Sequence, residues 1–218
     1  MTLPSSVSRH DVVRRGQWLT WATIGYNALE GVLSIGAGLL AGSVALVGFG
    51  FDSVLELTSS VAALWRLGND RHAVRRARTE RQSLRVIGAC FLLLAVYVAA
   101  EASRSLLAGE APAESPLGIA IAASSLVVMP LLARAKRRVA EQLSSRALNA
   151  EARQTEVCMI LSAILLGGLA LNTLLGWWWA DSLAALAMAP LIALEGVRAL
   201  RGQAPCGDGC GGSSHAEG

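Results

Sequence analysis

Six apolar stretches, each about as long as a lipid bilayer is thick, restrict what this chain can fold into. A hydrocarbon core roughly 30 Å thick is spanned by about 20 apolar residues of helix. The stretches are Trp18–Leu40, Val44–Trp65, Leu84–Leu107, Pro116–Ala133, Thr155–Leu175 and Trp177–Leu200. Since hydrophobic residues also make up 53% of the 218 residues, the sequence predicts an all-α, polytopic membrane protein with six transmembrane helices.

The basic residues predict how these helices are oriented. All 19 Lys and Arg residues except Arg104 lie in the N-terminal segment, in Arg66–Arg85, in Arg134–Arg153 or at the C-terminal end. These regions share one side if all six helices span, and positive charge collects on the cytoplasmic side. Both termini are therefore predicted to be cytoplasmic, and we expect a multi-pass protein of a bacterial inner membrane. No aromatic platform accompanies the basic segments, so no nucleic acid is expected as a partner.

Composition divides the chain into three parts. Residues 1–16 form an N-terminal cytoplasmic segment, residues 17–201 the six-helix membrane domain, and residues 202–218 a Gly- and Ser-rich tail that we expect to be disordered. The tail carries Cys206, Cys210 and His215, soft ligands that could capture a metal ion although a fourth ligand is lacking. Because the predicted topology places these cysteines in a reducing compartment, no disulfide framework is expected.

Asp52 and Glu56 are the most informative polar residues, because they lie inside the second apolar stretch. An ionised carboxylate in the middle of a membrane helix costs about 2.5–3.5 kcal/mol on insertion scales. The two side chains are four residues apart, so they share one helix face and repel each other. Binding protons or a cation would relieve this repulsion. Alternatively, both acids pair with a buried Arg or accept hydrogen bonds from Ser, Thr and Asn, although no Lys or Arg lies in the middle of a span apart from Arg104 near the end of the third.

The fifth apolar stretch offers further metal ligands. Gln154 and Cys158 lie four residues apart on one helix face, with Glu151 about one turn earlier on the same side. Divalent metals accept carboxylate, amide oxygen and thiolate ligands, and a tetrahedral site needs four. A cavity between the second and fifth helices could then hold one ion. Taken alone, Cys158 is equally compatible with being a small packing residue.

Asn27, Glu30, Glu156 and Asp181 are further polar residues in or beside the apolar stretches. Asn27 and Glu30 are about one turn apart and could face the same cavity, as support for the ligands, as a proton relay or as an access site. Glu156 points to a different side of the helix from Cys158, so the two cannot both face the centre. Asp181 follows three Trp residues near the outer interface, where we expect it to begin the sixth helix and to be hydrated.

Three segments resemble the cation diffusion facilitator family of six-helix divalent-metal transporters. They are AGSVALVGFGFDSVLELTSS, NAEARQTEVCMILSAILLGGL and WWWADSLAALAMAPLIALEGVRAL, similar to the family's first loop and second helix, its fifth helix and its sixth helix. The resemblance covers about residues 17–200 and implies a transport site at Asp52, Glu56, Gln154 and Cys158. Zinc carriers of the family generally have His or Asp at these places. Members also usually end in a folded cytoplasmic metal-binding domain, so the chain resembles a member that lacks it.

The sequence therefore predicts a carrier and not an enzyme. We expect efflux of a divalent metal cation by alternating access, with zinc as the first choice and cadmium, manganese and iron as the others. The resemblance implies exchange for protons, and acids that must lose protons to bind metal link the two fluxes. The metal is the substrate, no permanent cofactor is expected, and the membrane helices would hold a homodimer. The alternative is a non-transporting membrane protein that senses metal through its tail or organises partners through its basic loops.

Overall fold

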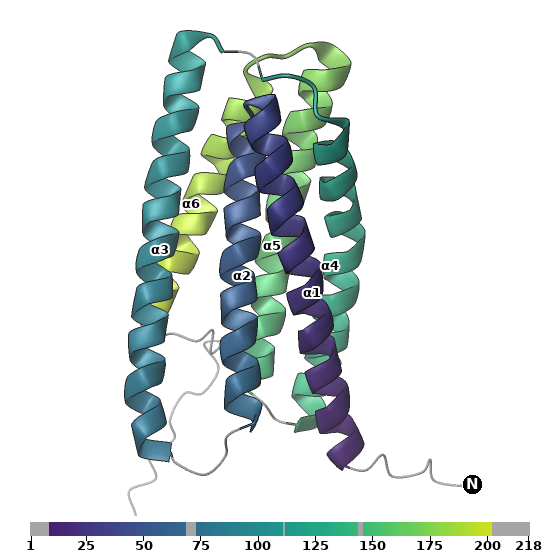
Figure 1. Ribbon diagram of the computed structural model, residues 1–218, viewed down its shortest axis with the longest axis vertical. Helices are drawn as coiled ribbons and strands as arrows, with labels where there is room; N and C mark the ends of the chain where they lie inside the picture. Colours follow the sequence, from purple (N-terminus) through teal and green to yellow (C-terminus); the bar gives the residue numbers. More distant parts are fainter. Residues whose placement is uncertain (1–8, 69–72, 111, 144–145, 202–218) are drawn as a thin grey trace, which may run out of the picture.

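Six long helices make up the fold, as predicted. The computed structural model describes residues 9–68, 73–110, 112–143 and 146–201, without the side chains at 9–11, 13, 59, 62–63, 65–68, 73–84, 143 and 146–151. The helices are α1 (Arg9–Ala41), α2 (Val44–Gly68), α3 (Ala73–Ala108), α4 (Pro116–Leu143), α5 (Arg146–Leu175) and α6 (Ala180–Leu200). They alternate in direction, so α1 begins and α6 ends toward the same side of the bundle (Figure 1). The predicted tail ligands Cys206, Cys210 and His215 lie outside the described residues.

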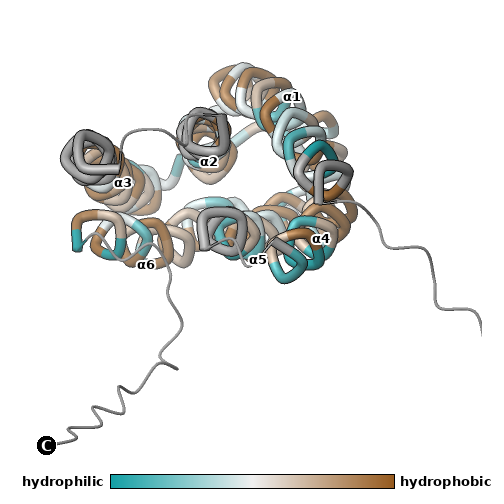
Figure 2. The backbone as a smooth tube through the Cα atoms, turned by 90° about the horizontal axis from the view of Figure 1, so that it is seen from below, coloured by the Kyte–Doolittle hydropathy of each residue, from teal (hydrophilic) through white to brown (hydrophobic). Residues whose placement is uncertain are grey.

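The helices form two layers of three. Seen along the bundle, α1, α2 and α3 form one row and α4, α5 and α6 the other, so that α2 and α5 face each other in the middle (Figure 2). The most extensive contacts are α3 with α6, α1 with α2, and α4 with α5. Since α2 also contacts α3, α5 and α6, it is the helix with the most neighbours, and its acids enter the centre of the bundle.

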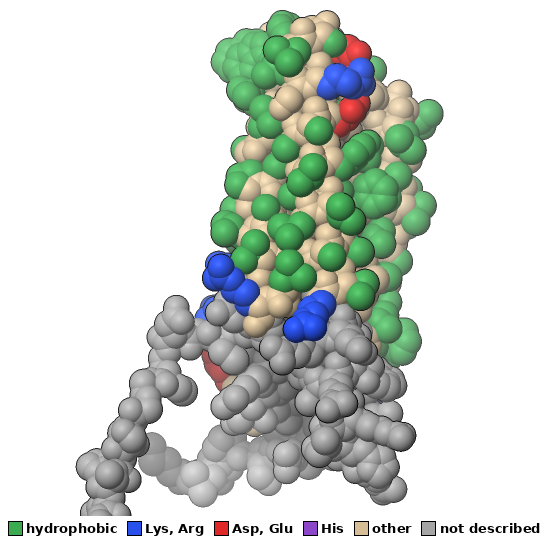
Figure 3. Space-filling view, turned by 90° about the vertical axis from the view of Figure 1, so that its left-hand side faces the viewer, with side chains coloured by type: hydrophobic (Ala, Val, Ile, Leu, Met, Phe, Trp, Pro, Cys, Tyr) green, Lys and Arg blue, Asp and Glu red, His purple; other side chains and the backbone are tan. Residues whose placement is uncertain are grey.

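The surface is that of a membrane protein. Hydrophobic side chains cover the middle of the face shown in Figure 3, and the described Lys and Arg side chains gather toward its ends. Stretches long and apolar enough to cross a membrane occur in α1, α3, α4, α5 and α6. For α2, several side chains beyond Thr58 lie outside the described residues, to which this finding is restricted. The chain is a polytopic membrane protein with six helices.

Glycines end three of the helices at the tight turns. Gly42, Gly109 and Gly176 have φ angles of 68°, 67° and 64°, in the left-handed region where a Cβ atom is disfavoured. The Gly176 N–H donates to the Asn172 carbonyl at 3.0 Å, which satisfies one of the free carbonyls at the end of α5. These turns connect α1 to α2 and α5 to α6 in two tight hairpins, which keeps consecutive helices antiparallel.

Small residues let α1 and α2 approach closely. A Cβ atom added at Gly38 would lie 2.7 Å from a methyl group of Val47, and one added at Gly50 would lie 2.8 Å from the Ile35 nitrogen. Such distances leave no room for a side chain, so the backbones meet where the sequence offers Gly. The close contact brings the polar face of α1 against α2.

Asp181 lies in the first turn of α6, close to the helix start that was expected there, but the predicted hydration is wrong. Its side chain is 1% exposed. Oδ1 accepts a hydrogen bond from the Ser43 hydroxyl at 2.6 Å, and Oδ2 accepts one from the Ala45 N–H at 3.4 Å. The start of α2 carries unpaired N–H groups and a partial positive charge, which a carboxyl group satisfies better than water can in this packed position. Asp181 therefore ties the start of α6 to the start of α2.

Candidate metal-binding site

Both acids of α2 lie inside the bundle. Asp52 is 6% exposed and Glu56 is 1% exposed. Because they lie four residues apart on a helix that packs against α5 and α6, both avoid the lipid-facing side. Three other acids lie close enough to act electrostatically on Asp52: Glu56, Glu30 of α1 and Glu195 of α6. The centre of the bundle is thus an acid-rich region, to which α1, α2 and α6 contribute.

Of the predicted ligands of α5, Cys158 lies beside these acids. Cys158 is 1% exposed and Gln154 is half-buried. The Cys158 thiol lies close to the Glu56 carboxyl group, and it interacts electrostatically with Glu56, Glu30 and Asp52. The Glu151 side chain lies outside the described residues. The four proposed ligands therefore come from two facing helices, and among them Cys158 and Glu56 lie close together.

A hydroxyl group of α5 holds Glu56. The Thr155 hydroxyl donates to Glu56 Oε1 at 2.8 Å, while Glu56 Oε2 has no hydrogen-bond partner among the described residues. A buried carboxyl oxygen without a partner is costly. Glu56 is thus positioned by one oxygen and has the other available for a ligand.

The polar residues of α1 join the same region. Asn27 and Glu30 are buried, at 0% and 3% exposure. The Ser53 hydroxyl, next to Asp52 in the chain, lies 3.0 Å from Glu30 Oε2. In the described part of the chain, Glu30 Oε1 and both polar atoms of the Asn27 amide have no hydrogen-bond partner. Both residues are buried, while it stays a prediction that they face the same cavity as the ligands and support them, relay protons or form an access site.

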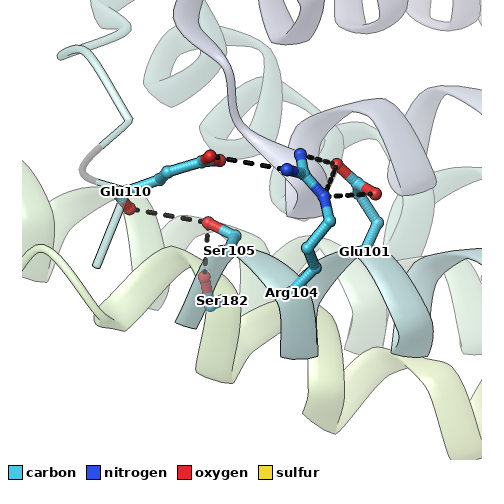
Figure 4. A network of polar contacts seen from close by, with 5 residues as sticks. All are labelled: Glu101, Arg104, Ser105, Glu110 and Ser182. Carbon is cyan, nitrogen blue, oxygen red and sulfur yellow. Dashed lines mark hydrogen bonds and ion pairs between the residues drawn. The ribbon is translucent and has the colours of Figure 1, made fainter. Parts of the chain in front are cut away.

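Arg104 does not neutralise the buried acids. Its guanidinium group is 60% exposed and pairs with Glu101 at 2.5 Å and with Glu110 at 3.4 Å. These residues lie at the end of α3 and in the loop that follows (Figure 4). Of the hydrogen bonds that the sequence left open for Asp52 and Glu56, the one from Thr155 to Glu56 is present, and Glu30 accepts a similar bond from Ser53. They satisfy one oxygen of each acid and supply no positive charge.

Glu156 is engaged elsewhere. It forms an ion pair with Arg137 of α4, and both side chains are more than one third exposed. This agrees with the expectation that Glu156 and Cys158 do not face the centre together. The pair connects α4 to α5 at the edge of the second layer.

The described side chains do not form a complete metal-binding site in this conformation. Among the described residues, no group of three or more His, Cys, Asp and Glu side chains converges closely enough to bind one ion. A metal ion held by Asp52, Glu56 and Cys158 would need an approach of α2 and α5 or a change of side-chain rotamers.

Lys136 is the functional candidate that the sequence reasoning missed. It belongs to the basic group Arg134–Arg153, which was interpreted only as a topology signal, yet its side chain is 0% exposed. Its ammonium group donates to the Thr155 hydroxyl at 3.3 Å. A signal was present in the sequence, because Lys136 falls on the helical stripe of small and apolar residues that includes Met129, Ala133 and Ala140, all of them buried.

Comparisons with known proteins identify similar chains. The family model for the cation efflux transmembrane domain matches residues 20–204. Transmembrane protein 163 of Xenopus laevis is 24% identical over 193 residues, which is 88% of this chain and 68% of the relative. An uncharacterized transporter of Synechocystis sp. is 27% identical over 78% of this chain and 56% of its own length. Magnetosome protein MamB of Magnetospira sp. is 24% identical, with coverages of 83% and 62%. The chain thus spans 56% to 68% of the length of these relatives.

Proposed function

Because the chain belongs to the cation diffusion facilitator family, we propose that it carries a divalent metal cation across the membrane. The transport site comprises Asp52, Glu56, Gln154 and Cys158, at the interface between α2 and α5. The observation that carries the proposal is the burial of both acids of α2 without a basic side chain bonded directly to either among the described residues. Buried carboxyl groups in a membrane bundle are costly, and a divalent cation offsets that cost.

The coupling of metal to protons follows from the same carboxyl groups. Metal binding requires that the acids and the Cys158 thiol lose their protons, and metal release lets the protons return. With Glu30 beside Glu56, three acids are available for this exchange. We therefore infer proton antiport with the site opening alternately to each side of the bilayer, in a homodimer held by membrane helices.

The ligand types suggest which metals are accepted. Two carboxyl groups, an amide and a thiol make a mixed set, in which the oxygens suit manganese and iron and the sulfur suits zinc and cadmium. Zinc remains the first choice, because it accepts carboxylate and thiolate ligands in a tetrahedral site.

The test is metal flux in proteoliposomes. Purified protein is reconstituted, and uptake of Zn²⁺, Cd²⁺, Mn²⁺ and Fe²⁺ is followed with and without an imposed pH gradient. The double variant Asp52→Asn, Glu56→Gln keeps the side-chain shapes and removes both charges, so flux of every metal should fall to the level of protein-free vesicles. Glu141→Gln, at an exposed acid of α4, is the matched control and should transport like the unmodified protein.

Two outcomes would contradict the proposal. Flux that persists in the double variant would exclude the α2–α5 site. Alternatively, metal tolerance of cells that is lost on deletion of residues 203–218 but retained in the double variant would favour the non-transporting sensor.

A further inference from the structure

A buried cation lies beside the proposed transport site. Lys136 of α4 is 0% exposed and is the one Lys or Arg side chain that is buried in the part of the chain whose side chains are described. Burying an ammonium group is costly unless it is hydrogen-bonded and lies near an opposite charge. The neighbouring Arg134, Arg137 and Arg138 are exposed. The position of Lys136 is therefore not explained by a need for cytoplasmic positive charge.

Lys136 is connected to a proposed ligand through a single side chain. Its Nζ donates to Thr155 Oγ1 at 3.3 Å, and Thr155 Oγ1 donates to Glu56 Oε1 at 2.8 Å. An ammonium group can only donate, and a hydroxyl has one proton to give. The direction of both bonds is thereby determined, and the chain runs from cation to acid across α4, α5 and α2.

We propose that Lys136 is a positioning residue for the transport site, which acts through Thr155 to hold the Glu56 carboxyl group in competition with a bound divalent cation. The inference rests on the proposed function and adds a residue that belongs to none of the predicted ligand sets. Its consequence is weaker binding and faster release of the metal.

The sign of the effect follows from the hydrogen bonds. Thr155 Oγ1 accepts a hydrogen bond from Lys136 Nζ, which directs the hydroxyl proton to Glu56 Oε1. The Thr155 hydroxyl therefore competes with the metal for Glu56 Oε1. This competition favours release, so its removal should tighten binding by at least about tenfold while turnover falls.

The experiment separates charge from geometry. Lys136→Met removes the charge and the donor, and Lys136→Arg retains both. Thr155→Val breaks the chain with little change of volume, and Thr155→Ser retains the hydroxyl. Arg138→Met, at an exposed cation two residues away, is the matched control. Binding of Zn²⁺, Cd²⁺, Mn²⁺ and Fe²⁺ is measured by calorimetry on purified protein, and the kcat and KM of flux are measured in proteoliposomes.

We expect Lys136→Met to lower Kd and KM by at least about tenfold and to lower kcat. Thr155→Val should act in the same direction. Lys136→Arg, Thr155→Ser and Arg138→Met should stay near the unmodified protein. If Lys136→Met does not fold, the two Thr155 variants decide, because they leave the ammonium group in place.

Unchanged or weaker metal binding in both Lys136→Met and Thr155→Val would overturn the inference, and so would a Lys136→Arg variant that behaves like Lys136→Met. The double variant at Asp52 and Glu56 distinguishes this failure from that of the proposed function. If it abolishes binding while the Lys136 and Thr155 variants match the unmodified protein, only the present inference fails. If it leaves binding intact, the transport site itself is wrong.

Discussion

Asp181→Asn tests how the two layers are held together at the start of α2. The Asp181 carboxyl group is 1% exposed and accepts hydrogen bonds from the Ser43 hydroxyl at 2.6 Å and the Ala45 N–H at 3.4 Å. An amide of the same shape can accept with its oxygen, but its NH₂ group must then face one of two donors. One buried donor loses its acceptor, and the favourable interaction of a carboxyl group with the helix start is lost as well.

The magnitude follows from these contacts. An unsatisfied buried donor costs about 1–3 kcal/mol, and the interaction with the start of α2 contributes about 0.3–1 kcal/mol. We therefore expect the free energy of unfolding to fall by about 2–3 kcal/mol. For a chain of this size the corresponding decrease in Tm is about 4–12 °C.

The assay is thermal unfolding in detergent, followed by circular dichroism, with Glu114→Gln as the matched control. Glu114 is exposed in the loop before α4, and its replacement should change Tm by less than about 2 °C, as is usual for surface substitutions. Metal binding should survive in Asp181→Asn, because Asp181 is not among the proposed ligands. The reasoning is refuted if both variants unfold at the same temperature.

Three further predictions concern packing and ligand chemistry. Gly50→Ala should destabilise the protein by about 1–3 kcal/mol, because the added Cβ would lie 2.8 Å from the Ile35 nitrogen, whereas Gly36→Ala, with nothing within 4 Å, should be tolerated; equal unfolding temperatures would contradict this. Glu30→Gln removes one of the buried acids and should raise the Kd for metal in calorimetry about tenfold, less than the Asp52, Glu56 double variant does; an unchanged Kd would place Glu30 outside the site. Cys158→Ser should reduce the flux of Cd²⁺ more than that of Mn²⁺, because sulfur is a soft ligand, and equal reductions would argue against ligation by the thiol.

The fold could be predicted from the sequence because its causes are local. Six apolar stretches of bilayer length determine the number of helices, and the glycines at positions 42, 109 and 176 determine where three of them end. The helices extend beyond the apolar stretches: α3 begins at Ala73 although its apolar part begins near Leu84. Hydropathy reports the span in lipid, whereas the backbone hydrogen bonds continue into the aqueous phase.

The surroundings of the site were less predictable, because they depend on contacts between helices. Sequence spacing places Asp52 and Glu56 on one face, but it does not reveal which hydroxyl group reaches them. Lys136 was grouped with the arginines next to it, because charge counting ignores which face of the helix a residue occupies. Asp181 was expected to be hydrated, because its proximity to Ser43 arises only when the first and last hairpins pack together.

The position of the candidate site within the bundle bears on how the proposed alternation could occur. Extensive contacts join α1 to α2, α4 to α5 and α3 to α6, whereas α2 and α5, which face each other in the middle of the bundle, contact each other less (Figure 2). The Ser53–Glu30 hydrogen bond lies between α1 and α2, and the Thr155–Glu56 bond crosses from α5 to α2. Movement of the α1–α2 pair relative to the α4–α5 pair must therefore break the Thr155–Glu56 bond while the Ser53–Glu30 bond persists. A metal ion that replaces Thr155 at Glu56 would release that connection, which links occupancy of the site to motion between these two helix pairs.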